Sequence, residues 1–228
     1  PDFQTDMFQK VKDKVALEDL RVEDQPETVA LQEWLHQVFA PFPYAGTPAG
    51  TPLSVGAVEL ADVIRFVRRN VLPNRSLLAL SAPMTAAEFR RFTSQYFGTW
   101  VKADPLPYEF SPPAPAKSSK ALLVGLPRAG RSCLLLGGEG FRMKHDDYLA
   151  SVLAMRLLQD RLDQLAARRP DYRFQAHGEG RMLGGYLLVQ AVGPADPDPA
   201  VFGEIQQAIA DIAAGKFTRE EFTREQQA

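Results

Sequence analysis

The sequence predicts an α+β protein, in which an antiparallel sheet is covered on one face by helices to give a two-layer α/β sandwich. Short apolar segments typical of strands occur in neighbouring pairs, and longer segments carry apolar residues at steps of three and four. Five prolines within 104–120 exclude a regular helix there and predict an extended, semi-rigid linker. We therefore predict one domain at 1–103 and a second at 121–228.

The first domain is predicted to be mostly helical. Apolar residues recur at helical spacing over 8–22 and again over 28–39. Thr51 followed by Pro52 is typical of an N-cap and a first helical position, and the helical pattern after it continues until Pro73. The domain is therefore expected to begin as a series of helices rather than as a sheet.

A single strand is predicted in the first domain. Leu77–Leu80 is short and continuously apolar, as expected of a buried strand. Thr85 and Glu88 then form a capping box that opens a helix, and Gly98 closes it. Because one strand cannot form a sheet, we expect its partner strands to lie upstream of Pro1.

The second domain is predicted to follow the order β-β-α-β-β-α-α. Turn residues separate its paired apolar segments, and a capping box at Thr218 and Glu221 starts its last helix. Strands joined as hairpins make an antiparallel sheet, which the long helices cover on one face. The expected elements are strands at 121–126 and 132–136, a helix at 148–165, strands at 173–177 and 184–192, and helices that begin near 198 and 218.

The composition excludes several classes of function. The net charge is −2, from 26 basic and 28 acidic residues without a long run of like charge, so we expect no nucleic-acid partner. No apolar window approaches the length that spans a bilayer, so we expect no membrane span, and the first residues lack the features of a signal peptide. Cys133 is the only cysteine, which excludes an internal disulfide and a Cys-based metal cluster, and its apolar neighbours predict a buried thiol.

A series of short motifs occurs in order along the chain. The motifs are Phe42-Pro43-Tyr44, Gly50-Thr51-Pro52, Leu72-Pro73-Asn74, Tyr96-Phe97-Gly98-Thr99-Trp100, Gly137-Gly138-Glu139-Gly140, Asp147-Tyr148-Leu149-Ala150 and Thr218-Arg219-Glu220-Glu221-Phe222. Each motif alone is weak, but the ordered set resembles the insulinase/pitrilysin family of zinc peptidases, the inverzincins, which includes mitochondrial processing peptidase. The resemblance covers nearly the whole chain and implies two consecutive processing-peptidase-like repeats, of which the first is incomplete.

The resemblance implies a catalytic zinc in the parent enzyme, but the chain lacks the motif that binds it. An inverzincin needs H-x-x-E-H on one helical face, where both histidines bind zinc and the glutamate activates the metal-bound water. The three histidines, His36, His145 and His177, fit neither this motif nor its reversed form. We therefore expect no zinc, no complete catalytic site and no activity from this chain alone.

One further zinc ligand of the family is a glutamate on a later helix. The resemblance places Glu18 at this ligand position, which makes Glu18 the candidate metal-binding residue. Val11 stands where the family usually has an earlier glutamate. An ordinary solvated glutamate on a helix is the alternative interpretation of Glu18.

The family's second repeat often supplies an arginine and a tyrosine that hydrogen-bond the substrate peptide near the scissile carbonyl. The resemblance places Tyr172 at the tyrosine position, where a core or rim tyrosine is the alternative interpretation. Ala166 falls at the expected arginine position, which leaves Arg168 and Arg169 as substitutes. The candidate substrate-binding residues are therefore Tyr172 and Arg168.

Three hypotheses for the function follow. In the first, the chain is part of a zinc-dependent metalloendopeptidase and contributes scaffold and a surface for a peptide or protein substrate, held as an added strand on a sheet edge. In the second, favoured by Val11 and Ala166, it belongs to a non-catalytic homologue that pairs with an active peptidase subunit. Both imply a homo- or hetero-oligomer with another peptidase-like subunit, and bacterial relatives are often exported to the periplasm. The third is an interaction module with no peptidase history.

Overall fold

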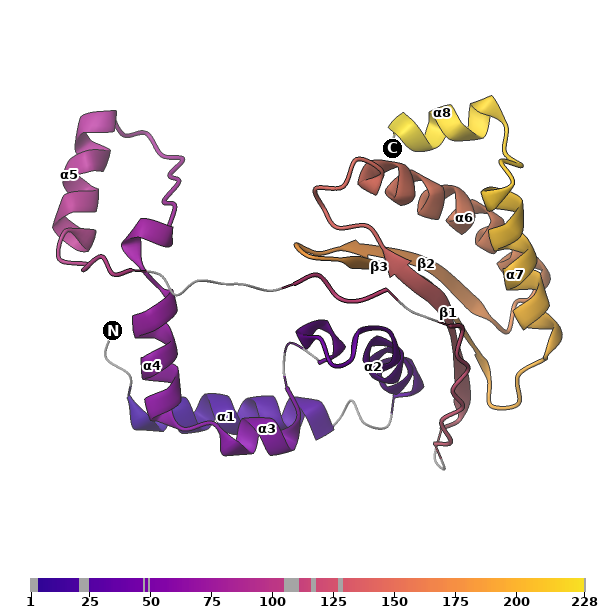
Figure 1. Cartoon of the computed structure of the whole chain (residues 1–228), viewed down its shortest axis with the longest axis horizontal. Helices are drawn as coiled ribbons and strands as arrows, with labels where there is room; N and C mark the ends of the chain where they lie inside the picture. The colour runs from indigo at the N-terminus through magenta and orange to yellow at the C-terminus, as the bar shows by residue number, and fades with distance from the viewer. Residues whose placement is uncertain are drawn as a thin grey trace. The chain divides into compact units, whose positions relative to one another are not determined.

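The computed structural model describes residues 4–20, 25–46, 48, 50–104, 111–115, 118–126 and 129–227, and the side chains of 16–20 lie outside this description. The chain forms two compact units, whose helices and strands are labelled in Figure 1. The helical unit combines Pro1–Ala16 with Pro52–Glu109, and the sheet unit combines Leu17–Thr51 with Phe110–Ala228.

In the helical unit, a lysine side chain of the first helix binds main-chain carbonyls at the end of the second. The amino group of Lys12 donates to the carbonyls of Gly56 at 2.7 Å and Val58 at 2.8 Å, which fastens the first helix to the turn between the next two. The elements are α1 (Thr5–Leu20), which continues into the sheet unit, α3 (Pro52–Ala57), α4 (Leu60–Asn70), the 3-10 turn η2 (Pro73–Arg75) and α5 (Ala86–Phe97).

The predicted capping box at the start of α5 is confirmed. The Thr85 N–H donates to Glu88 Oε2 at 2.8 Å, and the Glu88 N–H donates to Thr85 Oγ1 at 3.3 Å.

The strand predicted at Leu77–Leu80 is wrong, because this segment has no regular structure and Leu77 is 95% exposed. An apolar run becomes a strand only beside a partner strand, and the described part of the helical unit contains none.

The sheet unit is built on three antiparallel strands in the order β1-β3-β2, which confirms the predicted α+β class and its antiparallel sheet. In register, Leu135 pairs with Gln190, and His177 pairs with Leu188. The strands are β1 (Arg131–Gly140), β2 (Arg173–Gly180) and β3 (Gly185–Pro194), and the helices after β1 are α6 (Tyr148–Arg168), α7 (Ala200–Ala213) and α8 (Arg219–Gln227).

One predicted strand of this unit is wrong. Residues 121–126 have no regular structure, and a single strand, β1, extends beyond the predicted 132–136 to Gly140. The predicted turn between them lies partly outside the described residues, at 127–128, as do 105–110 and 116–117 of the proline-rich linker. The boundaries predicted at 1–103 and 121–228 stay a prediction.

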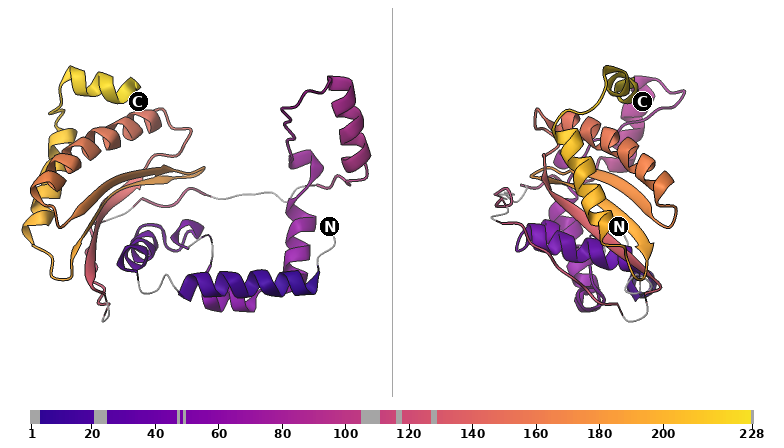
Figure 2. Two further views of the ribbon diagram at one scale, coloured as in Figure 1. Left: turned by 180° about the vertical axis from the view of Figure 1, so that it is seen from behind. Right: turned by 90° about the vertical axis from the view of Figure 1, so that its right-hand side faces the viewer.

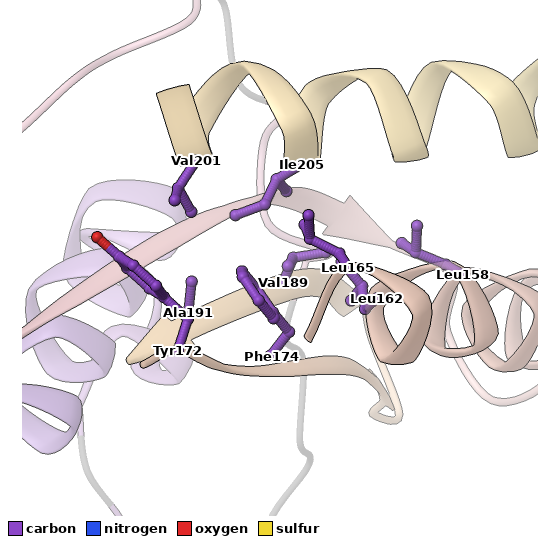
Figure 3. Close-up of a cluster of buried hydrophobic side chains, with 9 residues drawn as sticks. All are labelled: Leu158, Leu162, Leu165, Tyr172, Phe174, Val189, Ala191, Val201 and Ile205. Atoms are coloured by element: carbon purple, nitrogen blue, oxygen red, sulfur yellow. The ribbon is translucent and has the colours of Figure 1, made fainter. Parts of the chain in front are cut away.

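The main core lies between the sheet and the helices α6 and α7. Figure 3 shows side chains from these helices meeting those of β2 and β3, and Leu162 and Ile205 are both 0% exposed. Burial of each such side chain contributes about 1.5–3 kcal/mol. The cluster consists of Leu158, Leu162, Leu165, Tyr172, Phe174, Val189, Ala191, Val201 and Ile205.

The opposite face of the sheet is covered in part by α2 (Pro26–Phe39) and the 3-10 turn η1 (Pro43–Ala45), which lie on the other side from α6 and α7 in Figures 1 and 2. Leu35 and Phe39 pack there against Tyr186 and Leu188 of β3. A helix that precedes the linker by many residues thus adds a partial third layer, on the face of the sheet opposite to α6 and α7.

Candidate peptide-binding edge

β2 is an edge strand of the sheet in the described part of the chain. Its side chains alternate between the two faces. Phe174 and Ala176 face the core beneath α6 and α7, whereas His177 lies on the opposite face with its ring centroid 5.7 Å from that of Tyr186. An edge strand carries main-chain groups that no neighbouring strand satisfies, and these groups are a template for an added strand.

A side chain of α6 reaches this edge. The Ala176 N–H donates to Gln159 Oε1 at 2.7 Å, and Gln159 Nε2 donates to the Phe174 carbonyl at 3.3 Å. Alternate residues of an antiparallel strand direct their main-chain groups toward the partner strand, and those between direct theirs outward. The contacts with Gln159 therefore place the groups of Phe174 and Ala176 on the outer edge, together with those of Gly178 further along β2.

A polar cluster fixes the end of this edge, where β2 turns into β3. Arg181 Nε donates to Glu179 Oε1 at 2.6 Å, and the Tyr186 hydroxyl donates to Glu179 Oε2 at 2.6 Å. The guanidinium of Arg181 lies 4.8 Å from the ring centroid of Tyr44 and 5.5 Å from that of Tyr186. The Leu183 N–H donates to the Tyr44 hydroxyl at 3.3 Å, so the turn is held from both sides. We call Tyr44, Glu179, Arg181 and Tyr186 the Arg181 cluster.

Burial and hydrogen bonding set the charge states in the Arg181 cluster. Burial acts to raise the pKa of Glu179, but the hydrogen bonds from Arg181 and Tyr186 outweigh it and leave this pKa below its ordinary value. Burial, together with the hydrogen bond to Glu179, raises the pKa of Tyr186 to about 12. The cluster therefore combines an ionised carboxylate with a neutral phenol at physiological pH.

A shallow hollow of about 170 Å³ lies beside this turn within the sheet unit. Phe39, Phe141 and Leu183 contribute apolar walls, and Arg142 and His145 contribute polar groups. Its size suits one side chain of a bound peptide rather than a whole small-molecule ligand.

The described residues do not fit a zinc centre of this chain's own, because they contain no group of three or more His, Cys, Asp or Glu side chains placed to hold a metal ion. Burial raises the pKa of the Cys133 thiol, which disfavours the thiolate that a nucleophile or metal ligand requires. The chemistry that this arrangement supports is main-chain hydrogen bonding along an edge strand.

In the part of the chain that the structure describes, no helix combines the length and apolar character needed to cross a bilayer.

The comparison with protein families matches a model of the peptidase M16 inactive domain to residues 57–228. The chain belongs to the peptidase M16 family. This match confirms the resemblance to the insulinase family that the ordered motifs predicted. A comparison with curated protein sequences gave no significant match.

Several solved structures share this fold at low sequence identity. The peptidase M16 inactive domain from Pseudomonas fluorescens has 16% identity and a TM-score of 0.81, with 100% of this chain and 56% of that chain covered. A protease from Helicobacter pylori has 16% identity and a TM-score of 0.84, covering 98% and 57%. Complex III2 from Candida albicans has 13% identity and a TM-score of 0.64, covering 90% and 56%. The chain thus spans just over half the length of the solved chains that it matches.

The predicted metal ligand of this M16 chain lies on α1. Glu18 falls within the helix Thr5–Leu20, but its side chain lies outside the described residues. Val11, which stands in place of the family's earlier glutamate, is 56% exposed on the same helix. A role of Glu18 as a zinc ligand stays a prediction.

The two predicted substrate contacts of the M16 chain lie at the end of the sheet opposite the hollow. Tyr172 is 8% exposed, its ring stacks on Phe174 at 5.9 Å between centroids, and its hydroxyl accepts a hydrogen bond from the Asp198 N–H at 2.7 Å. Arg168 is exposed at the last position of α6. The neighbouring Arg169 pairs with Glu204 at 3.0 Å and Asp198 at 2.8 Å. The structure does not bring Tyr172 and Arg168 together with the hollow, and their contact with substrate stays a prediction.

Sequence reasoning missed the contact between Gln159 and β2. The signal was a polar residue on the apolar stripe of α6, four positions after Met155 and between Leu158 and Leu162. A polar side chain there must find partners in or near the core. Those partners depend on which strand forms the edge, which the sequence pattern alone does not define.

Proposed function

We propose that this chain supplies the substrate-contacting, non-catalytic part of a zinc-dependent metalloendopeptidase of the M16 family. The observation that carries the proposal is the match to the M16 inactive domain over 57–228, in a sequence that contains no H-x-x-E-H. Zinc, bound by H-x-x-E-H in another segment or subunit, would supply the activated water for peptide-bond hydrolysis.

In this proposal the chain's own residues bind the peptide. An extended peptide that adds to the β2 edge makes main-chain hydrogen bonds, which tolerate many sequences. The hollow beside the turn takes one apolar side chain, and Arg168, exposed at the end of α6, offers a positive charge to a longer substrate. The Tyr172 hydroxyl accepts a hydrogen bond from the Asp198 N–H, so in this proposal it would offer a substrate carbonyl the hydrogen of its own O–H group.

A second candidate is a non-catalytic M16 homologue that pairs with an active peptidase subunit. Two observations favour it. Val11 replaces a glutamate that the family usually has near its zinc ligand. The fold is also shared with a chain of complex III2 from Candida albicans, which is a multisubunit assembly. In both candidates, the chain works beside a second peptidase-like unit.

Zinc content and peptide cleavage, measured in two contexts, separate these candidates. The first context is the parent polypeptide with everything that precedes Pro1, and the second is the parent mixed with a separate M16 subunit that carries H-x-x-E-H. Stoichiometric zinc and cleavage of a quenched fluorescent peptide by the parent alone support the peptidase. Cleavage only in the mixture supports the non-catalytic homologue.

A Glu18→Gln variant of the parent tests the predicted ligand, with Glu27→Gln as its control because Glu27 pairs with Arg131 in the sheet unit. The peptidase proposal expects a lower zinc content for Glu18→Gln alone. Cleavage that is absent in both contexts, with no zinc bound, would overturn the proposed function.

A further inference from the structure

The side chain of Gln159 imitates a strand at the edge of β2. Its amide offers two N–H donors and one C=O acceptor, and one of these N–H groups together with the C=O matches the pair that a peptide unit offers. It accepts from the Ala176 N–H at 2.7 Å and donates to the Phe174 carbonyl at 3.3 Å. In a parallel added strand, a single residue makes this pair of bonds with residues that are two positions apart.

We propose that Gln159 acts as a guard of the β2 edge, which an extended peptide must displace to pair with Phe174 and Ala176. The inference rests on the proposed function, in which β2 receives a peptide as an added strand. While the amide is in place, the two main-chain groups are satisfied, and an incoming strand gains nothing there. The edge is thereby closed along its first half.

The remainder of the edge begins at Gly178, which is exposed and directs its main-chain groups outward like Phe174 and Ala176. The hollow and the Arg181 cluster lie at this end of β2. A peptide therefore pairs first at Gly178, and its extension toward Ala176 requires the Gln159 amide to rotate away. The guard selects peptides that are long enough to gain from the full edge.

A second contact lowers the free-energy cost of displacing the Gln159 amide from β2. Its Nε2 also donates to Asp163 Oδ1, one helical turn further along α6, at 2.7 Å. When the amide leaves the strand, this bond to Asp163 remains available on the helix surface. Gln207 makes the same contact with Asp211 on α7, at 2.8 Å. Gln207 therefore provides a matched control for the helix bond alone.

The test uses the whole chain, as wild type and as the variants Gln159→Ala, Gln159→Met and Gln207→Ala. The Met variant keeps most of the side-chain volume and removes the amide. The probe is a fluorescein-labelled peptide of alternating Thr and Val residues with flanking lysines. A second version of the peptide carries N-methyl groups on alternate amides, which block strand pairing. Fluorescence anisotropy gives the affinity, and amide hydrogen exchange reports on the Ala176 N–H.

We expect both Gln159 variants to bind the unmethylated peptide about tenfold more tightly than wild type or Gln207→Ala, because two competing hydrogen bonds are removed. Without peptide, the Ala176 amide should exchange faster in the Gln159 variants, and bound peptide should restore its protection. The methylated peptide should show no gain.

Equal affinity in wild type and Gln159 variants would overturn the guard and leave the proposed peptide-binding function standing. Tighter binding that leaves the Ala176 amide unprotected would also overturn the guard, because the peptide would then lie elsewhere. Absence of peptide binding to all four proteins would overturn both the guard and the peptide-binding role proposed for this edge.

Discussion

Replacement of Tyr186 by Phe tests the energetics of the Arg181 cluster. The substitution keeps the ring, which is 3% exposed, and removes the hydroxyl that donates to Glu179 at 2.6 Å. A hydrogen bond to a charged group contributes about 1.5–3 kcal/mol. Near neutral pH we therefore expect the sheet unit of Tyr186→Phe to be about 2 kcal/mol less stable than wild type.

The pH dependence of this stability difference gives a sharper test than its value near neutral pH alone. Folding raises the pKa of Tyr186 from 10.0 to about 12, which corresponds to roughly 2.7 kcal/mol of stability. Because the folded pKa lies above the unfolded one, this stability is fully present below pH 10.0 and is lost as the pH rises to about 12. The difference in stability between wild type and Tyr186→Phe should therefore shrink toward zero over this range.

Guanidinium unfolding followed by tryptophan fluorescence measures this difference. Trp34 lies in α2, with its ring centroid 5.4 Å from that of Tyr186, so it reports on the sheet unit. A Trp100→Phe background removes the other tryptophan. Tyr148→Phe serves as a control, since its ring packs beside Gly180, whose side-chain direction is toward the face of the sheet opposite to that of its neighbour Glu179. A difference that stays constant between neutral pH and pH 12 would refute the hydrogen-bond account.

Three further predictions concern the sheet unit. Leu162→Ala should reduce the free energy of unfolding by about 3–5 kcal/mol because the side chain is 0% exposed, whereas Leu149→Ala, at a position 76% exposed, should change it by less than about 0.5 kcal/mol in the same denaturation assay. The hydrogen bonds from Arg161 lower the pKa of Glu221 from 4.5 to about 2, so the stability that they give α8 is present above pH 4.5 and lost as the pH falls to about 2. Amide exchange of α8 should therefore become faster as the pH falls over this range. Glu221→Gln should abolish this acid-dependent increase. The raised pKa of Cys133 predicts slow reaction with a thiol reagent in the folded chain and fast reaction after unfolding, which a spectrophotometric thiol assay measures.

The β2–β3 hairpin and most of the helices were predictable because local signals define them, but the helical run predicted from Pro52 to Pro73 is divided into α3 and α4. The capping box of Thr218 and Glu221 forms as expected, with the Glu221 N–H donating to Thr218 Oγ1 at 3.1 Å. The failed strands at Leu77–Leu80 and 121–126 are both apolar segments without a neighbour to pair with in the described structure. Apolar character predicts a strand only when distant partners are also known.

The candidate site was less predictable than the fold. Tyr44 was noticed as part of a family motif, but its contact with Arg181 depends on how the turn after α2 lies beside the β2–β3 hairpin. Gln159 meets β2 only because the strand order leaves that strand at the edge. Tyr172 was weighed as a substrate contact, and sequence position alone does not reveal that Asp198 engages its hydroxyl.

The position of α2 limits where the gene that encodes this protein could be split into two genes. Arg131 at the start of β1 binds Glu27 of α2 at 3.0 Å, although 104 positions separate them, and Phe39 packs against Tyr186 across a still longer interval. A gene fission at the proline-rich stretch would put these partners on separate polypeptides and expose Tyr186 and Leu188 to solvent. Natural or engineered halves of this protein would then have to reassociate through α2, and substitutions on α2 would be tolerated only alongside compensating changes in β1 and β3.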